Sequence, residues 1–160
     1  MLQHIGYIGL PKHVGAGGFD HAAVHARTGQ IFVAHTANDA VDVIDPAAGG
    51  HIFSIPDLRG AAGVLVSDES QLVITSNRGE NTIGIFTPSR DPDVAKVPVG
   101  LRPNGLAYDP ARRLILVGNV GDVAVPGSHT LSMVGVDDRT VLAEITVPGR
   151  SRWAVYDPEI

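Results

Sequence analysis

The sequence lacks several features that would have pointed to particular classes of protein. It has no cysteine, and this excludes disulfide bonds and thiolate metal sites. It has no run of Lys and Arg, and its net charge is -5, so it lacks the basic stripe of a protein that binds nucleic acid. No apolar run approaches the roughly 18 residues of a membrane span. Residues 1–10 do not resemble a signal peptide, so the expected location is the cytoplasm.

Long helices are also missing from the pattern. No stretch keeps an amphipathic helical period over about 10 residues. The 19 Gly and 11 Pro would interrupt long helices often. Hydrophobic residues nevertheless make up 44% of the 160 residues, which is enough for a packed core. The sequence therefore predicts an all-β domain.

One unit occurs three times, at residues 24–46, 65–88 and 107–138. The residues Ile31, Leu72 and Leu114 open the corresponding strand in each unit and are 41 and 42 positions apart. This spacing is typical of the blades of a β-propeller, which repeat about every 40–45 residues. Each unit alternates short β-rich runs such as IFVAHT, LVITSN and LILVGN with turn signals.

Each unit is interpreted as four strands, a to d in chain order. The predicted fold is a β-propeller fragment with three four-stranded antiparallel blades at residues 19–58, 60–100 and 103–148. Residues 3–10 resemble a d strand and are expected to form an orphan outer strand at the N-terminus. Residues 152–160 are expected to begin a further blade, with an orphan inner strand at Trp153–Asp157. The exposed edges predict either a longer gene product or self-association through these edges.

The sequence resembles the YVTN-type β-propeller repeats, which belong to a broad group that includes the six-bladed regucalcin/gluconolactonase family. The three units carry this resemblance, together with the phrases PNGLAYDPARRLILVGN and SRWAVYDP. It covers nearly the whole chain and implies the propeller fold. It does not imply one function, because propellers host many unrelated activities.

Ligands of propellers usually bind at the mouth of the central channel, on the d-to-a and b-to-c loops. The favoured hypothesis is a binding module for a small anionic or polyhydroxylated ligand, because guanidinium groups bind carboxylate and phosphate. The alternative is that the arginines of these loops (Arg59, Arg102 and Arg152) are solvated or cap carbonyl groups. The residues expected to line the mouth are Arg59, Asn77, Arg102, Asn104, Asn119 and Arg152.

A second hypothesis is a metal-dependent lactonase or related hydrolase, as the gluconolactonase resemblance implies. In that family an Asn opening an NGL-type strand is a metal ligand, and Asn104 matches it. His21 replaces the expected Glu, with Asp20 adjacent, and Arg152 replaces the expected Asp. The expected cofactor is then a divalent ion (Ca²⁺, Mn²⁺ or Zn²⁺) held by Asn104, His21 and Asp20. An arginine beside such a site would repel the ion, and Pro-Asn-Gly is also a common turn.

Three aromatic side chains add further hypotheses. His21 and His35 are both expected near the mouth, as a metal pair or as structural histidines. Trp153, the single tryptophan, is expected to stack on a ligand or to pack between blades. A third function, a protein-interaction scaffold, needs only exposed propeller faces. Whether the protein is an enzyme is left open by the sequence.

Overall fold

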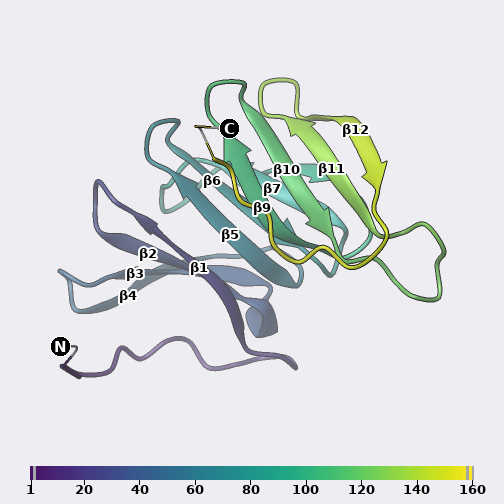
Figure 1. The fold of residues 1–160 in the computed structure, drawn as a ribbon. Coiled ribbons are helices and arrows are strands. Elements are labelled where there is room, and N and C mark those ends of the chain that lie inside the picture. Colours follow the sequence, from purple (N-terminus) through teal and green to yellow (C-terminus); the bar gives the residue numbers. More distant parts are fainter. Residues whose placement is uncertain (2, 158, 160) are drawn as a thin grey trace.

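A computed structural model describes residue 1, residues 3–157 and residue 159. It contains twelve β-strands in three four-stranded antiparallel sheets, together with the short 3₁₀ helix η1 (Thr36–Asn38) (Figure 1). The first sheet, blade 1, contains β1 (Phe19–His25), β2 (Gln30–His35), β3 (Ala40–Asp45) and β4 (Gly50–Ile55). Blade 2 contains β5 (Ala61–Ser67), β6 (Leu72–Asn77), β7 (Thr82–Phe86) and β8 (Ala95–Pro98). Blade 3 contains β9 (Pro103–Asp109), β10 (Leu114–Asn119), β11 (Thr130–Gly135) and β12 (Thr140–Thr146).

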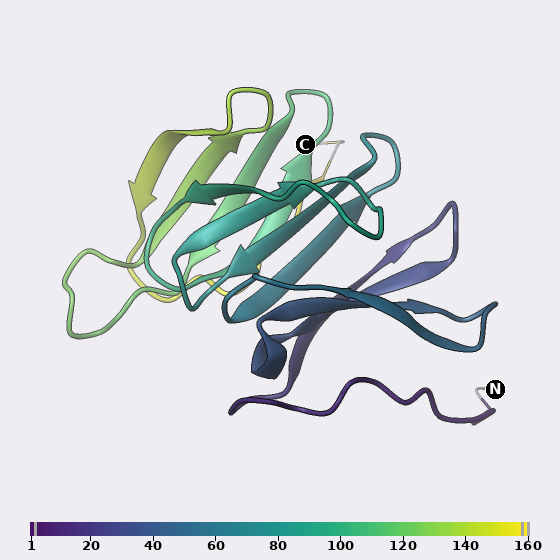
Figure 2. The same ribbon diagram turned by 180° about the vertical axis from the view of Figure 1, so that it is seen from behind.

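The strands of each blade are paired in chain order, so each blade is an up-and-down meander. The first strands of the three blades, β1, β5 and β9, contact one another in sequence and form the inner side of the array. Figures 1 and 2 show the three sheets arranged like a fan that does not close into a ring. The predicted fold class, an all-β propeller with three antiparallel four-stranded blades, is confirmed.

The strand ends correct the predicted register of blade 1. His35, Asn77 and Asn119 end β2, β6 and β10, and they are 42 residues apart in both steps (77 − 35 and 119 − 77). The counterpart of Leu72 is therefore Gln30, and the predicted alignment with Ile31 was wrong by one residue. The error arose because the alignment matched the first apolar residue of each strand, whereas the strand in blade 1 begins with a polar residue.

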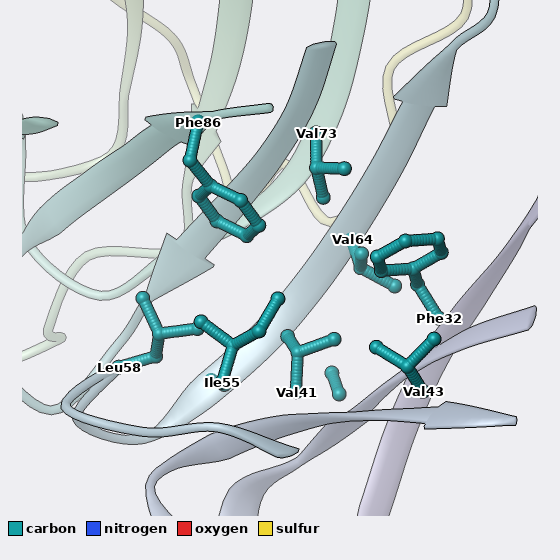
Figure 3. Packing of buried hydrophobic residues seen from close by; sticks show 10 residues of the cluster. Phe32, Val41, Val43, Ile55, Leu58, Val64, Val73 and Phe86 are labelled. Atoms are coloured by element: carbon teal, nitrogen blue, oxygen red, sulfur yellow. The ribbon is translucent and has the colours of Figure 1, made fainter. Parts of the chain in front are cut away.

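Blades 1 and 2 each present a four-residue apolar stripe to the blade that follows. The stripe of blade 1 consists of Phe32, Val41, Val43 and Ile55. Figure 3 shows these side chains pointing toward Val64, Val73 and Phe86 of blade 2, and all four are at most 1% exposed. At the corresponding positions, blade 2 has Ile74, Ile83, Ile85 and Val97, which pack against blade 3. Burying each such side chain contributes about 1.5–3 kcal/mol, so these interfaces hold the array together.

Blade 3 has the same stripe without a covering blade. Its members, at the corresponding positions, are Leu116, Leu131, Met133 and Ile145. Ile145 is 48% exposed, and the other three are only partly buried. The stripe is thus a property of the repeat, whereas its burial depends on the neighbouring blade.

The two flanking segments differ from the prediction of orphan strands. Neither residues 3–10 nor residues 152–157 form a strand. The physical reason is that a β-strand is defined by hydrogen bonds to a neighbouring strand, and no strand of the described chain pairs with either segment. Residues 152–157 nevertheless lie beside β9, where the Nδ2 atom of Asn104 donates to the carbonyl of Arg152 at 3.1 Å (Figure 1). Pro158 and Ile160, which belong to the predicted start of a further blade, lie outside the described residues.

None of the described helical residues forms a helix with the length and apolar character needed to cross a membrane.

Candidate functional site

The loops β2–β3, β4–β5, β6–β7, β8–β9 and β10–β11 and the segment after β12 lie at one end of the three blades, called the mouth below. At this end each inner strand has an irregular register. The shifts lie between Phe19 and Ala22 in β1, between Ala61 and Gly63 in β5, and opposite Val117 and Asn119 in β9. Bulges of this kind turn side chains away from regular alternation. They allow residues near the start of an inner strand, such as Asp20 and Asn104, to reach across the mouth.

The loops at the mouth are fixed to one another by a repeated hydrogen-bond pattern. Asp39 and Asn81 hold equivalent places before β3 and β7, with left-handed φ values of 51° and 58° that Asp and Asn tolerate. The Oδ1 atom of Asp39 accepts from the backbone N–H of Gly60 at 2.7 Å, and that of Asn81 accepts from the N–H of Arg102 at 2.8 Å. The same contact therefore fixes the backbone of Gly60 and of Arg102 in two successive blades.

A polar chain crosses the mouth from blade 1 to blade 3. The Nη2 group of Arg78, on the β6–β7 loop, donates to Oδ2 of Asp20 at 3.2 Å and also to Oδ1 of Asn104. The Nδ2 group of the same Asn104 amide donates to the carbonyl of Arg152. Asn104 is buried, and the Arg78 side chain is 31% exposed. These four residues are called the mouth clasp below.

The corrected register explains why Asp20 belongs to the clasp. Asp20, Ala62 and Asn104 are 42 residues apart in both steps (62 − 20 and 104 − 62), so Asp20 is the true counterpart of Asn104. The predicted counterpart, His21, lies one position later. Its Nε2 atom is 3.6 Å from Oδ1 of Asp20, and its ring lies against Trp153, with the ring centroids 4.5 Å apart.

The His21–Trp153 pair stands beside a cavity of about 540 Å³. Its walls are the inner strands β1, β5 and β9 together with residues 153 and 154, and most of its lining side chains are apolar. Trp153 is 73% exposed, so one face of the indole remains available for contact. The cavity combines mostly apolar walls with the imidazole of His21 and the indole of Trp153. Small-molecule sites usually have mostly apolar walls and a few polar groups.

The side chains of the three predicted mouth arginines lie at the surface; Arg152 joins the clasp only through its backbone carbonyl. Arg59 is on the β4–β5 loop, Arg102 is on the β8–β9 loop, and the Arg152 side chain follows β12. All three are exposed, and none takes part in an ion pair among the residues that the structure describes. Their charges are therefore not neutralised by an ion pair within the described chain.

Two predicted ligand residues lie inside their own blades instead. Asn77 and Asn119 are fully buried at the ends of β6 and β10. The Nδ2 group of Asn77 donates to Oγ1 of Thr82 at 3.0 Å, and that of Asn119 donates to the hydroxyls of Thr130 and Ser132 at 2.9 and 2.7 Å. In this arrangement both amides tie strand b to strand c and do not line the mouth.

His35 holds the corresponding position in blade 1. It is fully buried, and its Nδ1 atom lies 2.7 Å from Oδ2 of the buried Asp42. The Asp42 carboxylate also accepts from the hydroxyl of Ser54 at 2.6 Å. This network joins strands b, c and d of blade 1. His35 therefore has its own structural partner and does not pair with His21.

The predicted metal ligands do not fit a metal ion in this arrangement. The carboxylate of Asp20 and the amide oxygen of Asn104 both contact the same guanidinium nitrogen of Arg78, so a positive charge already lies between them. His21 turns toward Trp153. Among the described residues, no group of three or more His, Asp or Glu side chains is arranged to hold a metal ion.

Arg78 is the central residue that sequence reasoning did not select. The sequence identifies Arg78 only as a polar residue on the loop between strands b and c of the second blade. Its partners Asp20 and Asn104 are 58 and 26 residues away in the sequence. The available signal was its place directly after Asn77, in a loop next to the start of two inner strands.

Comparison with known proteins supports the fold and leaves the family open. No family model matches the chain, and no curated protein matches it. Among solved structures, hydrazine synthase from Kuenenia stuttgartiensis aligns with a TM-score of 0.78 and 14% identity over 96% of this chain and 43% of that one. The structure of a streptogramin B lyase aligns with a TM-score of 0.67 and 15% identity, over 86% of this chain and 44% of that one.

Both similar structures have β-propeller-type folds. This chain is therefore a repeat protein of the β-propeller class. The chain spans less than half the length of either of them. At 14 and 15% identity the likeness concerns the fold alone.

Proposed function

We propose that this chain provides part of a β-propeller binding module whose mouth takes a small anionic ligand. The supporting observation is the set of three exposed arginines, Arg59, Arg102 and Arg152, on separate loops around one mouth without ion-pair partners in the described chain. Guanidinium groups bind carboxylate and phosphate through paired N–H donors. The apolar cavity beside His21 and Trp153 would hold the uncharged part of the ligand.

The ligand class follows from the balance of charge at the mouth. The carboxylate of Asp20 is already paired with Arg78, so it does not cancel the charge of the three free arginines. Exposed Asp57 is paired with Lys96 at 2.9 Å. The carboxylates of Asp39 and Asp122 on the mouth loops accept backbone N–H groups of Gly60 and Ala124. The guanidinium groups of the three arginines have no such partner in the described chain, which supports a carboxylate or phosphate as the ligand. We also propose that the repeat is of the YVTN type, in the group that includes the regucalcin/gluconolactonase family. The segments PNGLAYDPARRLILVGN and SRWAVYDP support this assignment.

Calorimetric titration of the 160-residue chain with citrate and with gluconate tests the proposal. Sorbitol, which has hydroxyl groups but no charge, is the comparison ligand. We expect the two anions to bind and sorbitol to bind at least ten times more weakly. Arg102→Ala or Arg152→Ala is expected to weaken anion binding about tenfold, since hydrogen bonds to charged groups contribute about 1.5–3 kcal/mol.

The matched control is Arg139→Ala, in the β11–β12 turn at the end of the blades opposite the mouth. It removes the same charge, and we expect anion affinity to stay within twofold of the unmodified chain. If neither anion binds, or if Arg139→Ala weakens binding as much as the two mouth variants, the proposal is wrong. Equal affinity for sorbitol would also reject it.

The lactonase and scaffold alternatives stay predictions. A lactonase requires a base or a metal-bound water at the mouth, and the clasp uses Asp20 and Asn104 for Arg78 instead. No described feature favours a scaffold over a ligand-binding module.

A further inference from the structure

The mouth clasp contains two oxygen atoms of the kind that bind metal ions, and both accept hydrogen bonds from one guanidinium. Nη2 of Arg78 carries two hydrogens, and it has two acceptors, Oδ2 of Asp20 and Oδ1 of Asn104. The orientation of the Asn104 amide is fixed from its other side, because its Nδ2 group donates to the carbonyl of Arg152 at 3.1 Å. Its oxygen is thereby directed at Arg78.

The clasp also joins three blades at a single point. Asp20 comes from β1 in blade 1, Arg78 from the loop after β6 in blade 2, and Asn104 from β9 in blade 3. A cation bound by oxygens from several blades would do the same, since it attracts each ligand toward one centre. The guanidinium supplies that positive centre from within the chain.

The backbone holds Arg78 in this position. Its N–H donates to the carbonyl of Gly60 at 3.1 Å, and the N–H of Gly79 donates to the carbonyl of Arg59 at 2.9 Å. The Nε atom of Arg78 is buried and has no hydrogen-bond partner in the described chain. The side chain is therefore placed by the loop and by its Nη2 contacts, and it enters between Asp20 and Asn104 at the cost of one unpaired N–H.

We propose that Arg78 is a built-in substitute for a divalent cation, and that its removal converts the Asp20–Asn104 pair into a metal site. The unmodified chain is then indifferent to divalent ions at this mouth, because an ion would have to displace a covalently attached charge. Without the guanidinium, a carboxylate oxygen and an amide oxygen face a shared space, and both are ligand types that Ca²⁺ and Mn²⁺ accept. Water would complete the coordination. This inference does not depend on the anionic ligand proposed above.

The test uses the full chain with CaCl₂ and MnCl₂ as probes, at constant ionic strength. Thermal unfolding gives Tm, and the electron paramagnetic resonance signal of free Mn²⁺ gives direct binding. For the unmodified chain we expect millimolar Ca²⁺ or Mn²⁺ to change Tm by less than about 1 °C. For Arg78→Ala we expect Tm to fall by roughly 3–6 °C without metal, through loss of charge-assisted hydrogen bonds. Millimolar Mn²⁺ should then restore at least half of that loss, and at least ten times more Mn²⁺ should be bound than by the unmodified chain.

Three controls separate the clasp from general effects. Arg78→Met keeps the apolar stem and removes the charge, and it should respond to metal as Arg78→Ala does, including where the alanine variant fails to fold. The double variant Asp20→Asn with Arg78→Met should lose the metal response. Arg113→Ala frees the carboxylate of Asp137, which Arg113 contacts at 2.7 Å on another turn, and it should gain no metal binding.

Two results would overturn the inference. One is divalent-ion binding by the unmodified chain that disappears on Asn104→Ala, because the site would then accept a metal beside Arg78. The other is an Arg78→Met variant that binds no more Mn²⁺ than the unmodified chain. The anion titrations with Arg102→Ala and Arg152→Ala remain separate from both results, so failure here and failure of the proposed function are distinguishable.

Discussion

Blades 2 and 3 carry equivalent apolar stripes in different surroundings. In blade 2, Ile74 and Ile83 are fully buried, because blade 3 packs over them. In blade 3, the corresponding Leu116 and Leu131 are only partly buried. The two stripes are similar in composition, so the difference in burial comes from the neighbouring blade and not from the stripe itself. Each blade of such an array is stabilised mainly through its interfaces with adjacent repeats.

The largest expected effect comes from truncating the two stripes at matched positions. Ile74→Ala should lower the free energy of unfolding by about 3 kcal/mol, because it leaves a cavity at a closed interface. Leu116→Ala should cost less than about 1 kcal/mol, since its side chain already contacts solvent. Urea denaturation of both variants measures the difference. Equal losses would show that the stripe of blade 3 is covered in solution.

A second pair of variants compares the inner strands. Gly63 and Gly105 are equivalent residues of β5 and β9. A Cβ atom at Gly63 would lie 2.7 Å from Oγ of Ser76 and would also press on the backbone of β9, whereas one at Gly105 would lie 2.8 Å from Cα of Trp153. Gly63→Ala should therefore cost about 2 kcal/mol through overpacking. Gly105→Ala should cost less than half as much, because residues 152–157 belong to no sheet and can shift. Similar losses in thermal unfolding would contradict this difference.

The smallest expected effect concerns the contacts at the end opposite the mouth, where the interface of blades 1 and 2 differs from that of blades 2 and 3. Asp68 of blade 2 accepts from the N–H groups of Arg27 and Ala26 in blade 1, at 2.8 and 2.9 Å. The hydrogen bond from Arg27 is the main cause that lowers the pKa of Asp68 below its ordinary value of 3.8. The carboxylate therefore stabilises the fold above that value, and this contribution disappears as the pH falls through the lowered pKa.

Asp68→Asn should consequently reduce Tm at pH 6, and the difference from the unmodified chain should close as the pH falls below 3.8. Between blades 2 and 3, the corresponding end carries an uncharged hydrogen bond between the hydroxyls of Ser70 and Tyr108, 2.9 Å apart. Tyr108→Phe should shift Tm by an amount that does not change over the same pH range. A parallel pH dependence for the two variants would contradict the assignment.

The sequence predicts most of the fold because a blade is a local unit. Apolar runs separated by turn residues define each strand, and their repetition every 42 residues defines three blades. The one-residue error at Ile31 has a simple physical origin. Strand b begins at the polar Gln30 in blade 1 and at Leu72 and Leu114 in the other two, so hydrophobicity alone places the start differently. Residues 3–10 and 152–157 have strand-like sequences but form no strand, because neither segment has a neighbouring strand to pair with. The sequence pattern of a segment does not show whether such a neighbour exists.

The site is less predictable because its contacts join distant residues. Arg59, Arg102 and Arg152 are exposed at the mouth end, where the loop pattern places them. Asn77 and Asn119 look like loop residues in the sequence. Inside the blades, however, their amide groups donate hydrogen bonds to the hydroxyls of Thr82 and Thr130 on the next strands. Strand-end polar residues are therefore ambiguous until the facing strand is known. Arg78 could be assigned only once the bulged inner strands had been placed.

The mouth clasp has a consequence for how the array unfolds. In a linear series of repeats, each unit is coupled to its immediate neighbours, so terminal units can fray independently. Both hydrophobic clusters follow this rule, because each joins consecutive blades. The guanidinium of Arg78 instead connects Asp20 in the first blade with Asn104 in the third. Opening either end must break this link, which extends cooperativity from pairs of blades to all three.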